Sequence, residues 1–280
     1  MNIFKIKSYA KINLALNVTG KLTKLHKIES IVAFIDLYDL ISLKKIKKTK
    51  HIVRFSGKFA NNIKKNNTVQ KLFNILEEQN LLRDKKFQVK IRKNIPQKAG
   101  LGGGSMNAAS ILDFLMKKKF VKLNQKKLFK ISNLIGSDVI LGINPTSTVL
   151  KSNNTLRRFS KCPRFYTLLI KPNFGCSTKK IYSEVKRFTK SKFNKPKKSM
   201  FSLNFLIGQN NSLEKIALSK YPKLKKIKSF VNTLKSPLFV RMTGSGSVII
   251  GYYKSKQDCE LAKVQFKRKF KDYWCNTSKT

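Results

Sequence analysis

A dense cluster of glycines is the part of this sequence with the clearest potential for chemistry. Gly100 is followed by Leu101, by three consecutive glycines from Gly102 to Gly104, and by Ser105. Glycines let successive backbone N–H groups turn toward a phosphate, and a helix that begins there adds free donors and partial positive charge. The spacing matches neither a Walker A loop nor a dinucleotide fingerprint. The alternative is a flexible linker or a tight strand-to-helix turn.

The carboxylates are few enough to inspect one by one, since the chain has only 13 of them. Asp138 differs from the others because it follows Gly136 in the apolar stretch 134–141, where an isolated carboxylate is costly without a partner. Asp138 is therefore a candidate general base, although the residues alone favour a helix cap or turn residue at this position. Lys11 lies in an apolar strand-like stretch, where a charge also needs a partner, although strand alternation permits an outward position.

The glycine cluster falls between a predicted strand and a predicted helix, which is the setting of a phosphate loop. Residue alternation predicts strands at 3–16, 31–43, 87–91, 166–170, 238–242 and 248–253, with a strand-like stretch at 45–58 and an extended one at 148–150. Helical spacing predicts helices at 67–81, 105–119, 123–134, 213–220, 224–234 and 258–270, with one more beginning near Thr178 and a loop at 188–199. The turn-rich Ser152-Asn153-Asn154 places a domain boundary there, which predicts domains at 1–153 and 154–280.

Composition narrows the class of protein. A chain of 280 residues with 41% apolar residues can bury a core in each of two modest domains. The four cysteines form no C-x-x-C pair and there are only two histidines, which disfavours a zinc cluster or a disulfide scaffold and indicates a reducing cytoplasm. We see no secretory signal and no run close to the ~20 apolar residues of a membrane helix.

The formal net charge of +48 is a second compositional feature. A basic surface attracts nucleic acid, anionic lipid or phosphorylated metabolites. The lysines are spread along the whole chain, so we interpret the charge as compositional and expect no specific nucleic-acid partner and no membrane partner.

Three motifs in order along the chain resemble those of the GHMP kinases, which phosphorylate small alcohols. They are Tyr9-Ala10-Lys11-Ile12-Asn13-Leu14, then Pro96 with Gly100-Leu101-Gly102-Gly103-Gly104-Ser105, then Arg241-Met242-Thr243-Gly244-Ser245-Gly246-Ser247. Further segments are similar to the branch of that family whose alcohol carries a diphosphocytidyl group. These are His26-x-x-x-Ser30 leading into Ile35-Asp36-Leu37-Tyr38-Asp39, Ile135-Gly136-Ser137-Asp138-Val139, and Lys171-Pro172 with Ser177-Thr178.

The sequence departs from that branch at three positions. Leu25 stands where the branch has a tyrosine that stacks on cytosine, Met106 replaces a serine of the loop, and Ile140 replaces a proline. These departures concern the fit of the substrate and the fine geometry of the loop, and they leave the kinase class unchanged.

The resemblance implies an α+β fold of two domains, a ribosomal-protein-like N-terminal domain and a ferredoxin-like C-terminal domain with a cleft between them. It implies ATP and Mg²⁺ as cofactors and transfer of the γ-phosphate to the 2-hydroxyl of 4-diphosphocytidyl-2-C-methyl-D-erythritol, a step of non-mevalonate isoprenoid synthesis. The partner would be that small molecule, and the chain a monomer or homodimer. The Mg²⁺ ligands are not specified.

The resemblance also implies roles for individual residues. It pairs Lys11 with Asp138 as the catalytic residues. ATP would be bound by Pro96, Ala99, Gly100, Leu101, Gly102, Gly103, Gly104, Ser105, Asn107 and Asn67. Substrate would be bound by Asn13, His26, Thr178, Gly244, Ser245 and Gly246.

Structural alternatives accompany four of these assignments. Asn67 and Thr178 are also suited to cap helices, His26 to a solvated loop, and the segment 244–246 to a hairpin turn. Three rival functions stay open at this point: a GHMP kinase with another alcohol substrate, a GHMP relative without activity, and a basic RNA-binding protein without turnover.

Overall fold

The computed structural model describes residues 2–23 and 25–280, which form two compact units that are discontinuous in sequence. Unit 1 comprises the residues through Lys11, Leu37–Gln97 and Gly102–Pro145; unit 2 comprises Ile12–Asp36, Lys98–Leu101 and Thr146–Thr280. Two long strands, β1 (Phe4–Lys21) and β2 (His26–Ile46), contribute to both units. The division predicted at residue 153 stays a prediction.

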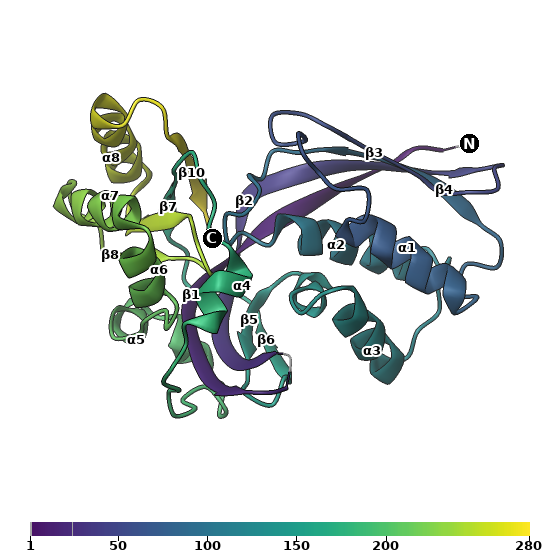
Figure 1. Cartoon of the computed structure of the whole chain (residues 1–280), viewed down its shortest axis with the longest axis horizontal. Coiled ribbons are helices and arrows are strands. Elements are labelled where there is room, and N and C mark those ends of the chain that lie inside the picture. Colours follow the sequence, from purple (N-terminus) through teal and green to yellow (C-terminus); the bar gives the residue numbers. More distant parts are fainter. Residues whose placement is uncertain (1, 24) are drawn as a thin grey trace. The chain divides into compact units, whose positions relative to one another are not determined.

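Unit 1 is a twisted sheet with helices packed along one face (Figure 1). Strand β4 (Lys86–Arg92) pairs antiparallel with β2 and parallel with β3 (Ile52–Ser56), and β1 pairs with β2. The helices are α1 (Thr68–Glu78), α2 (Gly103–Lys117), α3 (Gln125–Ile135) and the short 3₁₀ helix η1 (Val139–Gly142).

Alternating burial along β4 shows that one face of this strand packs against the helices of unit 1. Phe87, Val89 and Ile91 are fully buried, whereas Lys90 and Arg92 between and after them are exposed. Helix α1 meets that buried face with Val69, Leu72, Phe73 and Leu76, which follow the i, i+3, i+4 spacing of one helical stripe. The described core of unit 1 therefore lies between the sheet and its helices.

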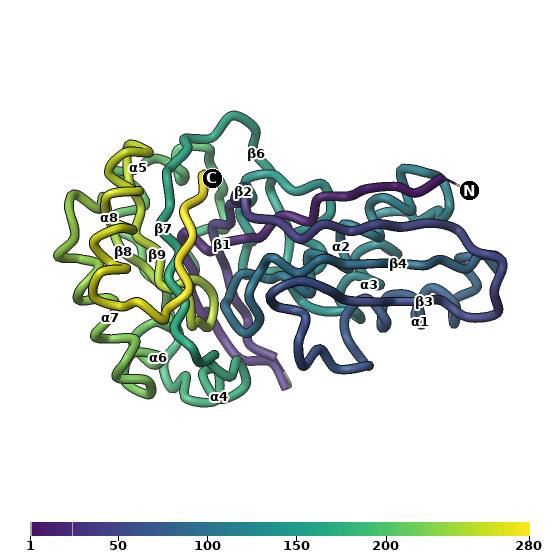
Figure 2. Tube along the Cα trace, turned by 90° about the horizontal axis from the view of Figure 1, so that it is seen from above, coloured from purple at the N-terminus to yellow at the C-terminus, as the bar shows by residue number. Residues whose placement is uncertain are grey.

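Unit 2 contains a second antiparallel sheet with the strand order β10-β7-β9-β8. Its strands are β7 (Tyr166–Lys171), β8 (Phe239–Met242), β9 (Ile249–Tyr253) and β10 (Trp274–Lys279). Within this unit the first half of β2 pairs with β5 (Ser147–Leu150), which pairs with β6 (Leu156–Phe159). The helices are α4 (Thr178–Ser183), η2 (Lys198–Phe201), α5 (Leu203–Ile207), α6 (Glu214–Lys220), α7 (Pro222–Thr233) and α8 (Lys256–Lys269). Figure 2 traces the chain through these elements.

The predicted α+β class is confirmed, and most predicted elements are present within a few residues. The stretch 45–58 was expected to be strand-like throughout, but β2 ends at Ile46 and a turn precedes β3 at Ile52. Strands β6 and β10 and helix α5 were not predicted. Strand β10 has the sequence Trp-Cys-Asn-Thr-Ser-Lys, which lacks the alternation of apolar residues that predicts a strand. Backbone pairing with β7 stabilises it.

None of the helices in the described part of the chain is long and apolar enough to cross a membrane.

Candidate active site

Lys11 and Asp138 form an ion pair in unit 1. Lys11 Nζ lies 3.2 Å from Asp138 Oδ2, with the side chains 5% and 29% exposed. Lys11 is therefore not an outward-facing strand residue. Asp138 precedes η1 but makes no side-chain capping bond, so capping does not account for its position. The pair places a carboxylate that solvent and ligands can reach beside a buried ammonium group, an arrangement suited to proton transfer next to developing negative charge.

The glycines before and within the first turn of α2 create space around this pair. Gly102 has φ +69°, and a Cβ at that position would lie 2.9 Å from Lys11 Cγ. Gly102 is also the N-cap of α2 and offers no side chain to cap it. Helix α2 thus begins with N–H groups that no capping side chain occupies, beside Lys11. Ser105 lies in that first turn, where its Oγ would be 3.7 Å from a Cβ on Gly136.

Asp39 holds the segment that leads into the glycine loop. Its buried carboxylate accepts hydrogen bonds from the backbone N–H groups of Asn94 at 2.7 Å and Ile95 at 2.9 Å, and from Lys93 Nζ. Lys93 is itself 3% exposed, and its Nζ would lie 3.3 Å from a Cβ on Gly103. Sequence reasoning missed this arrangement. The available signal was an acid on the inward face of β2, between apolar neighbours.

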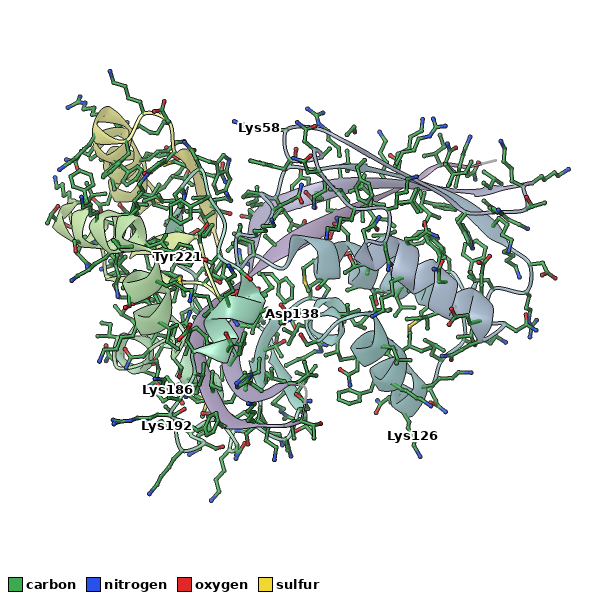
Figure 3. All side chains as sticks on the ribbon, viewed as in Figure 1. Lys58, Lys126, Asp138, Lys186, Lys192 and Tyr221 are labelled. Carbon is green, nitrogen blue, oxygen red and sulfur yellow. The ribbon has the colours of Figure 1, made fainter. Side chains whose placement is uncertain are left out.

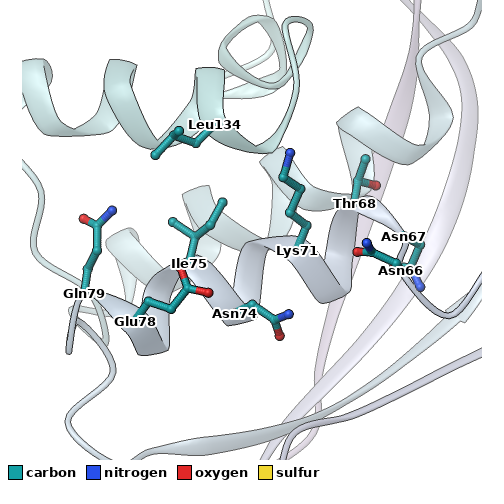
Figure 4. Close-up of a pocket in the computed structure, with 9 residues that line it drawn as sticks. All are labelled: Asn66, Asn67, Thr68, Lys71, Asn74, Ile75, Glu78, Gln79 and Leu134. Carbon is teal, nitrogen blue, oxygen red and sulfur yellow. The ribbon is translucent and has the colours of Figure 1, made fainter.

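A cavity of about 590 Å³ runs along α1 toward α3 (Figure 4). Thr68, at the start of α1, connects it to the glycine loop because Thr68 Oγ1 donates to the Gly104 carbonyl oxygen at 2.7 Å. Asn67 caps α1, since its Oδ1 accepts from Val69 N–H and Gln70 N–H. Most of the lining was not predicted; it comprises Asn66, Asn67, Thr68, Lys71, Asn74, Ile75, Glu78, Gln79 and Leu134.

Residues 98–101 and the segment between β8 and β9 lie against each other in unit 2. Gly100 approaches Thr243 so closely that a Cβ would lie 2.1 Å from the Thr243 carbonyl oxygen. Ser247 N–H and Val248 N–H donate to the carbonyl oxygens of Lys98 and Ala99, both at 3.3 Å. The segment between β8 and β9 is thus a hairpin connection that also contacts residues 98–101. The assignment of 244–246 to substrate binding stays a prediction.

Asn13 is tied into the same region of unit 2. Its backbone N–H donates to Thr243 Oγ1 at 3.0 Å, and its side-chain Nδ2 donates to Ser30 Oγ at 2.8 Å. Thr178 Oγ1 and Ser245 Oγ lie 2.9 Å apart, while the cap of α4 is Ser177. Thr178 therefore contacts Ser245 of the segment between β8 and β9 and is not the capping residue that the alternative required.

His26 lies among aromatic rings in unit 2. Its ring centroid is 5.1 Å from that of Tyr182 and 6.4 Å from that of Phe188, whose side chain is 47% exposed. Burial, followed by the charge of Lys21, lowers the pKa of His26 below its usual 6.5. A neutral imidazole is both a donor and an acceptor, as a base-recognising group must be. Sequence reasoning identified His26 but missed both rings.

A buried carboxylate binds the segment 188–199, which begins with Phe188. Glu29, which is fully buried, accepts from Asn17 Nδ2 at 2.8 Å, from Lys192 N–H at 2.8 Å and from Phe193 N–H at 3.0 Å. The polar segment 188–199, predicted as a loop, is thereby fixed to β2 of the same unit, next to His26.

The predicted site residues divide between the units. Unit 1 contains Lys11, Asn67, Pro96, Gly102, Gly103, Gly104, Ser105, Asn107 and Asp138. Unit 2 contains Asn13, His26, Ala99, Gly100, Leu101, Thr178, Gly244, Ser245 and Gly246.

Two family models match the chain. The model of the GHMP kinases N terminal domain matches residues 67–147, which include the glycine loop and Asp138, and the model of the GHMP kinases C terminal matches 188–272. Together with the site geometry, these matches define the class of the protein as a GHMP kinase, and that class makes ATP the phosphoryl donor.

Closer relatives define the family within that class. A 4-diphosphocytidyl-2-C-methyl-D-erythritol kinase of Pelagibacter ubique is 55% identical over 280 residues, all of both chains. The chain therefore belongs to the 4-diphosphocytidyl-2-C-methyl-D-erythritol kinase family.

Solved structures show the same fold. A crystal structure of a 4-(cytidine 5'-diphospho)-2C-methyl-D-erythritol kinase matches 98% of this chain and 99% of its own, with a TM-score of 0.78 and 22% identity. Homoserine kinase from Cytophaga hutchinsonii matches 100% of this chain and 95% of its own, with a TM-score of 0.73 and 15% identity.

Proposed function

We propose that this protein transfers the γ-phosphate of ATP to the 2-hydroxyl of 4-diphosphocytidyl-2-C-methyl-D-erythritol, as a step of non-mevalonate isoprenoid synthesis. The observation that carries the proposal is the ion pair of Lys11 and Asp138, which are 3.2 Å apart beside the first turn of α2. The substrate follows from the family, whose members are named for this reaction.

Asp138 is the general base in this proposal. Its carboxylate accepts the proton of the 2-hydroxyl while that oxygen forms a bond to the γ-phosphorus and the bond to the β,γ-bridging oxygen breaks. Lys11, which forms an ion pair with Asp138, offsets negative charge on the transferring phosphoryl group. The products are the phosphorylated alcohol and ADP.

The uncapped start of α2 supports its assignment to the phosphates of ATP. The N–H groups after Gly102 supply donors to an anion, and glycine at 102–104 keeps side chains out of their way. Mg²⁺ prefers oxygen ligands and, when bound, would neutralise negative charge on the phosphates of ATP. The Ser105 hydroxyl in the first turn is the protein oxygen that we assign to it.

The cavity along α1 supports a place for the rest of the nucleotide. Thr68 binds the Gly104 carbonyl oxygen and also lines the cavity, so a nucleotide with its phosphates on α2 can extend along α1. Asn66 and Lys71 add polar groups there (Figure 4). Asn67 has two roles in this proposal. Its Oδ1 caps α1, and its side chain lines the cavity in which the nucleotide would lie.

The aromatic surroundings of His26 support its assignment to the cytosine base. Tyr182 and Phe188 provide ring surfaces that can stack on a pyrimidine, and His26 provides hydrogen bonds. Leu25, which stands where the family resemblance implies a tyrosine, is 63% exposed and provides no ring. In this chain the stacking surface therefore comes from the second half of the sequence. We assign Asn13, Thr178 and Ser245 to binding of the polyol and the diphosphate of the substrate.

The free cysteines support a reducing compartment, and we infer the cytoplasm. Cys176 and Cys259 are buried thiols, and burial raises the pKa of Cys176 to about 11 and that of Cys259 to about 12. Such thiols are poorly ionised and react slowly.

The test is ADP release from Mg·ATP with four alcohols: the cytidyl compound, mevalonate, homoserine and galactose. Phosphorus NMR of the product locates the new phosphate. We expect turnover with the cytidyl compound alone and a phosphate on its tertiary 2-hydroxyl. Turnover with another alcohol would retain the kinase class and overturn the substrate, and the absence of turnover with all four would overturn the reaction.

A further inference from the structure

The sheet of unit 1 has an open face with a concentration of positive charge. Figure 1 shows α1 and α2 along one side of the sheet, and Figure 2 looks onto the other, where no described helix or strand of unit 1 packs. Side chains that point to this side come from four strands. We call the set the basic sheet face: Lys5 and Lys7 of β1, Tyr38 of β2, Arg54 of β3, and Lys90 and Arg92 of β4.

Strand alternation assigns these residues to the open side. On β4 the neighbours Val89 and Ile91 are fully buried, so Lys90 and Arg92 point the other way, and both are exposed. Lys5, Lys7 and Arg54 are exposed as well. Residues two apart on a strand are ~6.8 Å apart on one side, so the face presents regularly spaced cations.

The cations of this face have no carboxylate partner in the part of the chain that the structure describes. Among the ion pairs of residues 2–23 and 25–280, none engages Lys5, Lys7, Arg54, Lys90 or Arg92. Arg54 and Lys90 are register partners on neighbouring strands, so two like charges lie side by side. Adjacent like charges destabilise a sheet, and a bound polyanion would relieve that repulsion.

An aromatic pair lies within the same face. The rings of Tyr9 and Tyr38 meet edge to face at 5.6 Å, and Lys7 Nζ lies 4.8 Å from the centroid of the Tyr38 ring. A sheet face that combines cations with aromatic side chains is suited to binding single-stranded nucleic acid, through phosphate contacts and base stacking.

We propose that the basic sheet face binds single-stranded nucleic acid without sequence preference, with phosphates on its lysines and arginines and a base against Tyr38. An acidic membrane is the less suitable partner. Membrane-surface elements insert a row of large apolar side chains, whereas the outward residues of β4 are Lys86, Gln88, Lys90 and Arg92. This inference is independent of the proposed kinase reaction.

The experiment must separate this face from the general positive charge of the chain. Lysines project from both units, among them Lys58 and Lys126 in unit 1 and Lys186 and Lys192 in unit 2 (Figure 3). The face variant carries Lys7→Gln, Arg54→Gln, Lys90→Gln and Arg92→Gln. The control variant removes the same charge from exposed positions around α3, with Lys122→Gln, Lys126→Gln, Lys127→Gln and Lys130→Gln. A third variant is Tyr38→Leu.

Binding is measured between 50 and 300 mM salt by fluorescence anisotropy of a labelled single-stranded oligonucleotide of mixed sequence. A length of about 20 nucleotides is more than enough to cross the face. We expect the face variant to flatten the slope of log K against log salt by up to about 3, because each lost phosphate contact removes about 0.7. We expect Tyr38→Leu to weaken binding about fivefold or more. The control variant should bind like the unaltered protein, and melting temperatures establish that all variants are folded.

Three results would overturn the proposal. Equal loss in the face and control variants would mean that the charge acts diffusely. Unchanged binding by Tyr38→Leu, together with equal affinity for a duplex of the same sequence, would remove the stacking and the preference for single strands. Binding to vesicles that contain phosphatidylserine, without binding to the oligonucleotide, would assign the face to a membrane.

Discussion

Asp138 and Lys11 are brought to 3.2 Å from two elements of unit 1, the start of η1 and strand β1, although they are distant in the sequence. The ammonium group is nearly fully buried, and the carboxylate is the more accessible of the two. A buried cation next to a reachable anion costs desolvation free energy, and it is retained where the pair has chemistry to perform. The first two predictions follow from this asymmetry.

Replacing Asp138 with asparagine removes the base and keeps the shape of the side chain. We expect kcat for phosphoryl transfer to fall by about 10²–10⁴-fold, the usual contribution of general-base catalysis, with ATP affinity retained. Asp113→Asn is the matched control because Asp113 pairs with exposed Lys117 on the surface of α2. A kcat for Asp138→Asn equal to that of the control would remove Asp138 from the mechanism.

Replacing Lys11 with methionine keeps the length of the buried stem and removes its charge. Because Asp138 then loses its partner and the cation beside the reacting groups is gone, we expect kcat to fall about 10²-fold or more. Lys5→Met on the same strand, an exposed position, should leave kcat unchanged. Normal turnover by Lys11→Met would show that the ion pair is structural only.

Asp39 should matter more for stability than for chemistry. It is fully buried and holds Lys93 and the N–H groups of Asn94 and Ile95. Asp39→Ala leaves a buried ammonium group unpaired, for which we expect about 3–5 kcal/mol lower free energy of unfolding in urea, with a raised KM for ATP because the glycine loop follows this segment. The double variant Asp39→Leu, Lys93→Met should recover part of the stability, and an additive loss would argue against a coupled pair.

The fold class and the position of the glycine loop could be predicted from the sequence because they depend on local patterns, whereas most individual site residues were assigned through resemblance to a family. Alternation along β4 and the helical stripe of α1 result from burial on one face, and the glycine loop needs glycine for its backbone conformation. The pairing of Lys11 with Asp138 was available only through resemblance to a family. Nothing local to either residue specifies which distant side chain will meet it.

Features that depend on tertiary contacts were missed for the same physical reason. Strand β10 has few apolar residues and is stabilised by its ladder with β7, which no local pattern reveals. Tyr182 and Phe188 lie in a short helix and a polar loop, and their approach to His26 is set by contacts such as those of Glu29. The cavity along α1 likewise arises where α3 lies opposite α1.

Substrate binding should depend on the protonation of His26. Burial and Lys21 lower the pKa of His26 below 6.5, so the imidazole is neutral at pH 7 and becomes charged only as the pH falls through that lowered value. We expect KM for the cytidyl substrate to rise in that acidic range, while KM for ATP stays level. Lys21→Gln removes one of the two causes and should move the titration to higher pH.

Proton NMR can follow this titration directly because the chain has only two histidines, His26 and His51. His51→Gln identifies the signal of His26. Burial also lowers the pKa of His51, which stacks on Phe73 in unit 1 and should not respond to Lys21→Gln or to the cytidyl substrate. A His26 signal that titrates at or above 6.5, or that ignores the substrate, would contradict its assignment as the base-recognising residue.

Gly102→Ala should damage catalysis although it adds only one methyl group. The residue has φ +69°, where a side chain is strained, and the added Cβ would lie 2.9 Å from Lys11 Cγ. Since Lys11 must move to relieve that contact, we expect a loss of about 1–2 kcal/mol in stability together with a fall in kcat that exceeds any change in KM for the cytidyl substrate. Gly208→Ala is the matched control because its φ is −75° and its Cβ would have its nearest neighbour at 3.7 Å. Measuring the free energy of unfolding and kcat on both variants separates the two effects. A Gly102→Ala protein that is less stable but has an unaltered kcat would show that catalysis tolerates displacement of Lys11. That result would contradict a role of the ion pair in positioning the reacting groups.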